Sequence, residues 1–157
     1  MPHARPQIVI VCGPTATGKT QLAVRLAARF GGEIVNADSM QVYRYMDIGT
    51  AKPDADERRA APFHLVDVAD PDDTFSTGRF KDMAQAAIEE ILARGRVPIV
   101  AGGTGLYIKA LTQGLFDGPS ADPQLRAAYK AQETAEPGSL YRDRKSTRLN
   151  SSHGKLS

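Results

Sequence analysis

The chain has 157 residues, 41% of them hydrophobic, which is enough for the core of one α/β domain and too little for two. Its 20 basic and 18 acidic residues leave a net charge of +2, so net charge gives no indication of a nucleic-acid partner. No apolar stretch approaches the roughly 18 residues that cross a bilayer, and residues 1–6 lack the apolar segment of a signal peptide. We therefore expect a cytoplasmic protein with no membrane partner.

The first part of the chain alternates between strand and helix patterns. Residues 7–12 form a β-branched run before Gly13-Pro14, which predicts a buried parallel strand in which the single cysteine, Cys12, is also buried. From Gly18 onward, apolar residues recur every three or four positions until Gly31-Gly32. This spacing predicts a helix of about three turns.

Two further strands are expected before the middle of the chain. Residues 33–37 and 63–68 are short apolar runs that predict strands, and residues 45–61 predict a loop with a short helix over 56–60. Asp67, near the end of the later run, is a candidate metal-binding acid.

The second half of the chain continues the alternation. Ser76 is expected to cap a helix that ends at Gly95, and residues 97–101 predict a fourth strand. Helical patterns follow over 106–111 and, with few apolar anchors, over 124–136. Short strand–helix–strand connections predict an α/β fold, a parallel sheet with helices on both faces.

Residues 13–20 match the pattern G-x-x-x-x-G-K-[ST] between a predicted strand and a predicted helix, so the predicted α/β fold is of the P-loop NTPase type. Glycines let backbone N–H groups surround phosphate oxygens, Lys19 adds a positive charge, and the Thr20 hydroxyl can ligate Mg²⁺. The alternative is a glycine-rich turn without a ligand. The usual occupant of such a nucleotide-binding loop is ATP or GTP, and no Asn-Lys-x-Asp guanine motif is present. The predicted phosphate-binding residues are Gly13, Pro14, Thr15, Ala16, Thr17, Gly18, Lys19 and Thr20.

Asp38 follows the second predicted strand, so we expect its carboxylate beside the phosphate loop. Three roles remain open for it: an outer ligand of Mg²⁺, a general base, or the N-cap of a short helix that begins near Met40. Polar neighbours indicate a polar acceptor; they are Ser39, Gln41, Tyr43 and Arg44.

Five blocks of this sequence resemble, in order and spacing, the tRNA dimethylallyltransferase family. They are residues 13–20, Asp38 to Tyr43, Met46 to Pro53, His64-Leu65 with Asp67, and Gly102 to Tyr107. The block at 46–53 is the most specific, because ordinary nucleotide kinases have no reason to carry it. The resemblance extends from about residue 7 to about residue 142.

The resemblance implies transfer of a dimethylallyl group from dimethylallyl diphosphate to the N6 amine of the adenine beside the tRNA anticodon. The diphosphate and Mg²⁺ would bind at the phosphate loop, with Thr20 contacting both and Asp38 acting as the general base. The tRNA contacts that the resemblance implies are Asp38, Ser39, Met40, Gln41, Thr104 and Arg126. A monomer is expected.

The resemblance also implies how the chain is divided. Members of the family are considerably longer, so we expect a sheet that is incomplete at the C-terminus. Residues 1–121 would form the catalytic core, residues 122–142 would begin a helical tRNA-binding insertion, and residues 143–157 would be a disordered or artefactual tail. Two other functions stay open: an ATP-dependent kinase of a small metabolite, and a diphosphate-binding remnant without activity.

Overall fold

The computed structural model describes residues 8–115 and 123–142. The chain divides into two compact units, residues 1–115 and residues 116–157. The predicted boundary at 121/122 and the predicted tail at 143–157 both lie outside the described residues.

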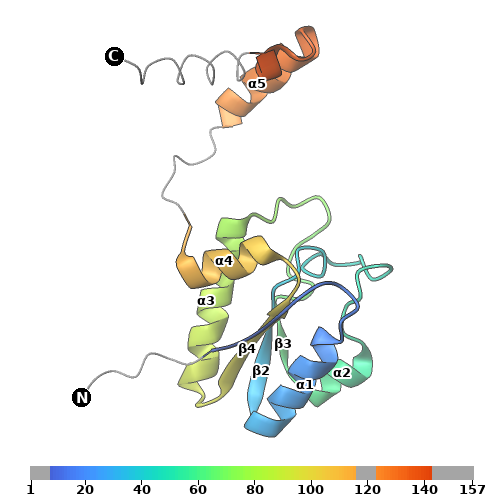
Figure 1. Cartoon of the computed structure of the whole chain (residues 1–157), viewed down its shortest axis with the longest axis vertical. Helices are drawn as coiled ribbons and strands as arrows, with labels where there is room; N and C mark the ends of the chain where they lie inside the picture. Colours follow the sequence, from blue (N-terminus) through green and yellow to red (C-terminus); the bar gives the residue numbers. More distant parts are fainter. Residues whose placement is uncertain (1–7, 116–122, 143–157) are drawn as a thin grey trace, which may run out of the picture. The chain divides into compact units, whose positions relative to one another are not determined.

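The first unit is built on a four-stranded parallel sheet (Figure 1). Its strands, in spatial order, are β1 (Val9–Cys12), β4 (Val97–Gly102), β2 (Gly32–Asn36) and β3 (Phe63–His64). Ile34 of β2 pairs with Ile99 of β4, and Val35 pairs with Val100. Because successive residues of a strand point to opposite faces, the two isoleucines face one side of the sheet and the two valines face the other.

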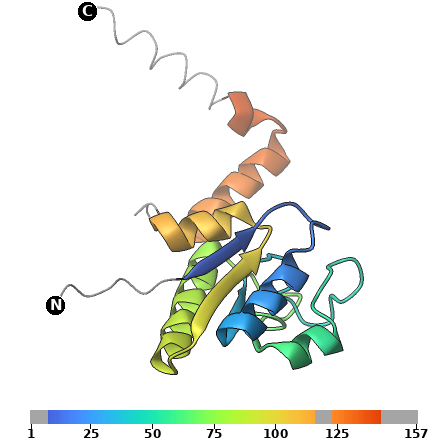
Figure 2. The same cartoon turned by 60° about the horizontal axis from the view of Figure 1, so that its bottom comes forward.

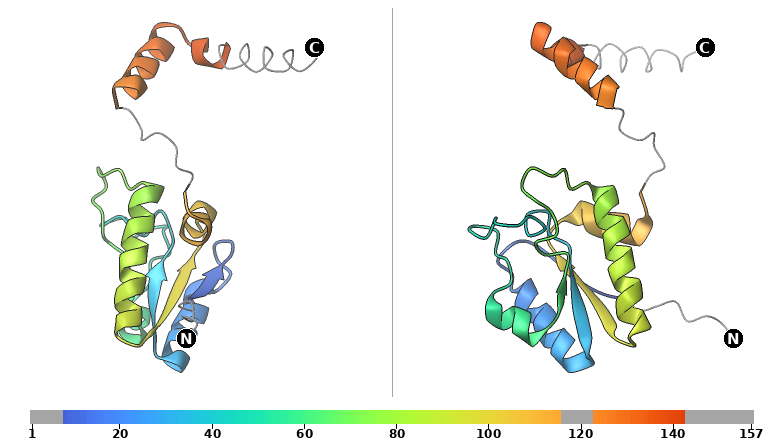
Figure 3. Two further views of the ribbon diagram at one scale, coloured as in Figure 1. Left: turned by 90° about the vertical axis from the view of Figure 1, so that its left-hand side faces the viewer. Right: turned by 180° about the vertical axis from the view of Figure 1, so that it is seen from behind.

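Helices cover both faces of this sheet (Figures 2 and 3). On one face, α1 (Lys19–Phe30) packs Ala23 and Ala27 against the isoleucine side, with α2 (Ala55–Ala60) beside it. On the other face, α3 (Thr77–Ala93) and α4 (Gly105–Gln113) enclose a larger core with the valine side. The predicted α/β fold with helices on both faces is therefore confirmed for residues 8–115.

Local signals set several element ends. The Ser76 hydroxyl accepts a hydrogen bond from the Arg79 amide (3.1 Å), which confirms it as the N-cap of α3. Gly31 follows α1 with φ 62°, a left-handed conformation that glycine adopts without strain. Each signal acts within a few residues, which is why the sequence alone was enough to place these ends.

Two expectations about the strands of this unit are wrong. The strand predicted over 63–68 stops at His64, because Leu65 and Asp67 have φ values of 61° and 58° and cannot continue a pleated strand. Cys12 is exposed rather than buried. It is the last residue of β1, which lies at the edge of the sheet and has β4 as its neighbour on one side only.

The second unit contains α5 (Pro123–Ala135), close to the helix predicted over 124–136. After α5, the Glu133 carboxylate accepts hydrogen bonds from the amides of Gly138 (2.6 Å) and Leu140 (3.3 Å), which turns the chain back toward the helix. Among the described residues of both units, no helix is both long enough and apolar enough to cross a membrane.

Candidate active site

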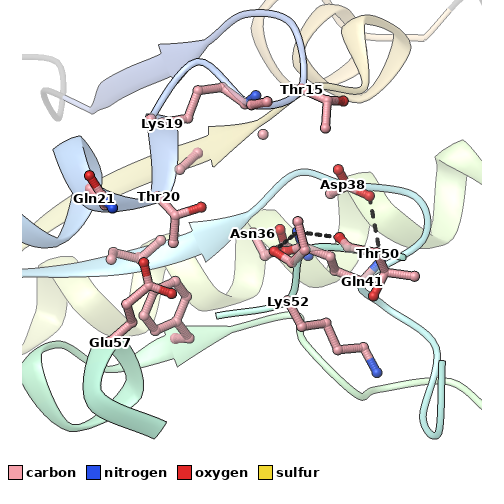
Figure 4. A pocket seen from close by; sticks show the side chains of 17 residues that line it. Thr15, Lys19, Thr20, Gln21, Asn36, Asp38, Gln41, Thr50, Lys52 and Glu57 are labelled. Atoms are coloured by element: carbon pink, nitrogen blue, oxygen red, sulfur yellow. Dashed lines mark hydrogen bonds between the residues drawn. The ribbon is translucent and has the colours of Figure 1, made fainter. Parts of the chain in front are cut away.

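A cavity of about 300 Å³ opens at the carboxyl ends of the strands (Figure 4). The segments that follow β1 and β2 meet there beside the last residues of β4, as expected for a ligand site in a parallel sheet. Its lining includes Thr15, Lys19 and Thr20 from the phosphate loop, with Asp38 and Gln41 from the segment after β2. The structure thus brings the phosphate loop and Asp38 to one cavity.

The predicted phosphate loop, residues 13–20, leads directly into α1. Gly18, with φ 77°, precedes the first residue of α1, and a glycine there leaves the amides of the first turn without a side-chain cap. The loop is closed on itself, because Thr17 Oγ1 donates to the Pro14 carbonyl (2.8 Å) and Lys19 Nζ donates to the same oxygen. The uncapped amides and the Lys19 charge can together hold an anion.

Asp38 is oriented by its own chain. Its Oδ1 accepts hydrogen bonds from the amides of Met40 (2.9 Å) and Gln41 (3.4 Å). The short helix predicted near Met40 is wrong, since a turn stands there, yet the predicted capping contact exists in the form of that turn. Within residues 8–115, no hydrogen bond engages Oδ2. Figure 4 shows the Asp38 carboxylate across the cavity from Lys19 and Thr20.

The segment after β4 is tied directly to the Asp38 turn. Thr104 Oγ1 accepts from the Ser39 amide (3.0 Å) and donates to Ser39 Oγ (3.3 Å). The strand ends approach so closely that a Cβ placed on Gly102 would lie 2.2 Å from the Ala37 carbonyl oxygen. Thr104 and Ser39, both predicted tRNA contacts, therefore hold each other within the protein.

A cluster of charges beside the cavity was not predicted from the sequence. Lys52 Nζ donates to the Tyr43 carbonyl (2.7 Å), to Asp47 Oδ1 (2.7 Å) and to Asp67 Oδ1 (2.6 Å). Arg58 donates to the second Asp67 oxygen (2.9 Å). Both oxygens of Asp67 are thus taken by cations, so the structure does not support Asp67 as a metal ligand. The residues of this cluster come from separate parts of the chain, and no local sequence pattern marks them.

The cations also set the ionisation of Asp67. Burial by itself would raise the pKa of this carboxyl, but the hydrogen bonds from Lys52 and Arg58 outweigh burial and hold the pKa below its usual value. The contacts with Lys52 and Arg58 therefore favour the charged form of Asp67 in the folded chain. It acts as a structural anion rather than as an acid or base.

The remaining predicted contact, Arg126, falls within α5 of the second unit, and its side chain lies outside the described residues. Its role stays a prediction. No group of three or more His, Cys, Asp or Glu side chains able to hold a metal occurs among the residues that the structure describes.

Comparison with known proteins decides the family. The family model described as IPP transferase matches residues 41–151, well over half of the chain. The chain belongs to the IPP transferase family. This confirms the resemblance read from the five sequence blocks.

Individual family members with assigned names are closely similar. The tRNA dimethylallyltransferase of Anaeromyxobacter dehalogenans strain 2CP-C is 60% identical over 126 residues, which cover 80% of this chain and 42% of that protein. The tRNA dimethylallyltransferase 1 of Syntrophotalea carbinolica is 56% identical over 138 residues, which cover 87% of this chain and 44% of that protein. The chain thus spans less than half the length of these IPP transferase relatives.

Solved structures share the fold. The full-length tRNA isopentenylpyrophosphate transferase from Bacillus halodurans superposes with a TM-score of 0.71 at 40% identity, covering 98% of this chain and 51% of that one. A eukaryotic dimethylallyltransferase studied while acting on tRNA gives a TM-score of 0.72 at 32% identity, covering 88% of this chain and 35% of that one. The predicted P-loop α/β fold is confirmed by these IPP transferase structures.

Proposed function

We propose that this chain provides the donor-binding core of a tRNA dimethylallyltransferase, which moves a dimethylallyl group from dimethylallyl diphosphate to the N6 amine of the adenine beside the anticodon. Membership of the IPP transferase family and the names of its relatives support the reaction. The observation that carries the proposal is that one cavity holds both an anion cradle and a carboxylate facing it. A tRNA substrate agrees with a cytoplasmic enzyme, and we propose that it acts as a monomer.

The donor would bind through its diphosphate. The amides of residues 15–20 and the Lys19 ammonium would hold the phosphate oxygens at the amino end of α1. The Thr20 hydroxyl supplies the same cavity with an oxygen of the kind that Mg²⁺ prefers. We propose that Thr20 holds Mg²⁺ together with the diphosphate. When bound, the ion neutralises charge on the leaving group.

The adenine that accepts the prenyl group would bind beside Asp38. As the adenine N6 forms its bond to the prenyl carbon, the carbon–oxygen bond to the diphosphate breaks and its electron pair leaves with the diphosphate. The N6 proton goes to Asp38 Oδ2, because Oδ1 already accepts two amides of the turn. The adenine must leave its stack to enter the cavity. We propose tRNA contacts at Asp38, Ser39, Met40, Gln41, Thr104 and Arg126.

The test is donor choice. An enzyme of the relatives' length that carries residues 8–115 of this chain is incubated with tRNA and either labelled dimethylallyl diphosphate or γ-labelled ATP. We expect label to reach tRNA from the prenyl donor only. Phosphoryl transfer from ATP to a small metabolite, without prenyl transfer to tRNA, would instead establish the kinase alternative.

A further inference from the structure

We propose that Lys52 is a positioning residue, which holds the segment 46–53 against Gln41 and thereby sets the orientation of the Asp38 carboxylate. The segment is the most family-specific part of the sequence, yet the reaction proposed above assigns it no role. The catalytic part of this inference rests on the proposed function. The positioning part does not, because it concerns contacts within the chain.

The contacts of Lys52 leave no donor for a ligand. An ammonium group has three N–H donors, and Lys52 Nζ has three acceptors: the Tyr43 carbonyl, Asp47 Oδ1 and Asp67 Oδ1. The side chain is only 5% exposed. In Figure 4 it extends away from Lys19 and Thr15. Although Lys52 lines the cavity, it is therefore not arranged to bind a diphosphate.

The charge of Lys52 is maintained by its partners. Burial would lower the pKa of this ammonium, but the hydrogen bonds to Asp47 and Asp67 outweigh burial and raise the pKa above its usual value. The lysine is charged at neutral pH. A nearly buried charge is costly unless it is fully paired, so the three acceptors restrict the segment to one arrangement.

The segment that Lys52 anchors presents two carbonyl groups to Gln41. Gln41 Nε2 donates to the carbonyl oxygens of Thr50 (3.0 Å) and Ala51 (2.8 Å), the two residues before Lys52. Thr50 Oγ1 in turn donates to the Met46 carbonyl (2.6 Å), which keeps the segment folded on itself. Displacement of Lys52 would therefore move the groups that hold the Gln41 side chain.

Gln41 passes this restraint to Asp38. The Gln41 carbonyl accepts from the Asp67 amide (3.1 Å), and the Gln41 amide donates to Asp38 Oδ1 (3.4 Å). Asp67 thus contacts Lys52 through its carboxylate and Gln41 through its backbone. Lys52, Asp67 and Gln41 are therefore linked in a closed ring through these contacts and the backbone of residues 50–52. The Asp38 turn is attached to this ring at the Gln41 amide.

The structural test compares two charge removals in the full 157-residue chain. Lys52→Met keeps the length of the side chain and removes the charge. Arg94→Met is the control, because Arg94 pairs with the buried Glu33 rather than with the Asp38 turn. We expect Lys52→Met to shift the NMR amide resonances of Met40 and Gln41. Arg94→Met should lower the melting temperature and leave both resonances in place.

A second variant covers the case in which Lys52→Met does not fold. Asp67→Asn keeps the backbone amide that holds Gln41 and weakens the contact to Lys52, so it should shift the same two amides by a smaller amount. Asp47→Asn should shift them least, because the Asp47 side chain is 71% exposed. If none of the three variants moves these amides, the positioning role is wrong.

The catalytic test uses the enzyme of the relatives' length. Lys52→Met should reduce kcat by about tenfold or more, because a misplaced base loses its alignment with the reacting atoms. The Kd for pyrophosphate with Mg²⁺ should change by less than about threefold, because Lys52 does not contact the diphosphate in this proposal. If Lys52→Met weakened pyrophosphate binding as much as Lys19→Met does, Lys52 would be a phosphate ligand and the proposal would be overturned. If the parent enzyme transfers no prenyl group, the proposed function fails while the amide shifts still decide positioning.

Discussion

At the scale of single residues, the two oxygens of Asp38 have separate tasks. Oδ1 accepts the amides of the turn, and Oδ2 faces the cavity. Asp38→Asn keeps an acceptor for the turn but cannot take a proton, whereas Asp38→Ala removes both functions. We expect each variant to lower the rate of prenyl transfer by about 10²-fold or more, as for loss of a general base.

The comparison of the two variants separates these tasks. The pyrophosphate Kd, measured by calorimetry with Mg²⁺, should stay near the parent value in Asp38→Asn, and only Asp38→Ala should disturb the Met40 amide resonance. Normal turnover by Asp38→Asn would return Asp38 to a purely structural role. Equal loss of turnover and of pyrophosphate binding in Asp38→Asn would instead make Asp38 chiefly a metal ligand.

Lys19 provides the second prediction at this scale. Its ammonium lies in the phosphate loop and donates to the Pro14 carbonyl, which a diphosphate would replace as acceptor. We expect Lys19→Met to weaken pyrophosphate binding by about tenfold or more, since a charge-assisted hydrogen bond contributes roughly 1.5–3 kcal/mol. Arg29→Met is the matched control, because it removes a charge from the last turn of the same helix. If both variants weakened pyrophosphate binding equally, the effect would come from the change in net charge and not from a contact of Lys19 with the diphosphate.

At the scale of elements, the close approach of β2 and β4 shapes the site. A Cβ on Gly102 would lie 2.2 Å from the Ala37 carbonyl oxygen, whereas the nearest atom to a Cβ on Gly103 would be 3.4 Å away. Gly102→Ala must therefore push the strand ends apart. We expect it to lower the free energy of unfolding by about 2 kcal/mol or more, and Gly103→Ala by much less. Urea denaturation of both variants measures this difference, and similar values for the two would contradict it.

Elements with local causes could be predicted from the sequence, and those with distant causes could not. The Ser76 cap and the glycine turn at residues 13–18 each depend on residues a few positions apart, and the structure contains both. The strand predicted beyond His64 ends because Leu65 is in a left-handed conformation, and its carbonyl accepts a hydrogen bond from the Asn36 side chain (3.0 Å), far away in sequence. The periodicity of apolar residues within one segment gives no information on a contact with a distant segment.

The same distinction applies to the site. Asp38 was predictable because it follows a recognisable strand at the edge where ligands bind. Lys52 was not, because its partner Asp67 lies 15 positions away and the backbone of Asp67 is in a left-handed conformation. The family-specific block at 46–53 was visible in the sequence, but its contacts became apparent only in the folded chain.

At the scale of the whole molecule, one buried carboxylate near the start of β2 joins three elements, and no residue of its cluster lines the active-site cavity. Glu33 of β2 has a side chain that is 6% exposed, and it contacts His64 of β3 (2.7 Å) and Arg94 at the end of α3 (2.8 Å). Arg96, just before β4, lies 3.6 Å away. Burial would raise the pKa of this carboxyl, but its hydrogen-bonded partners outweigh burial and lower the pKa below its usual value.

The lowered pKa makes the stability of the sheet depend on pH. A carboxyl whose pKa is lower in the folded state stabilises the fold above its unfolded value and loses this contribution as the pH falls through the folded value. At pH 7, Glu33→Gln should be less stable than the parent by about 1–3 kcal/mol, the usual effect of losing hydrogen bonds to charged groups. Between about pH 5 and pH 3 the parent should lose stability more steeply, so that the two unfolding free energies converge. Urea denaturation of both proteins across this range isolates Glu33, because every other acid is common to both. A difference that stays constant with pH would show that folding does not lower the pKa of Glu33. Pyrophosphate binding should be the same in both, since no residue of the Glu33 cluster lines the cavity.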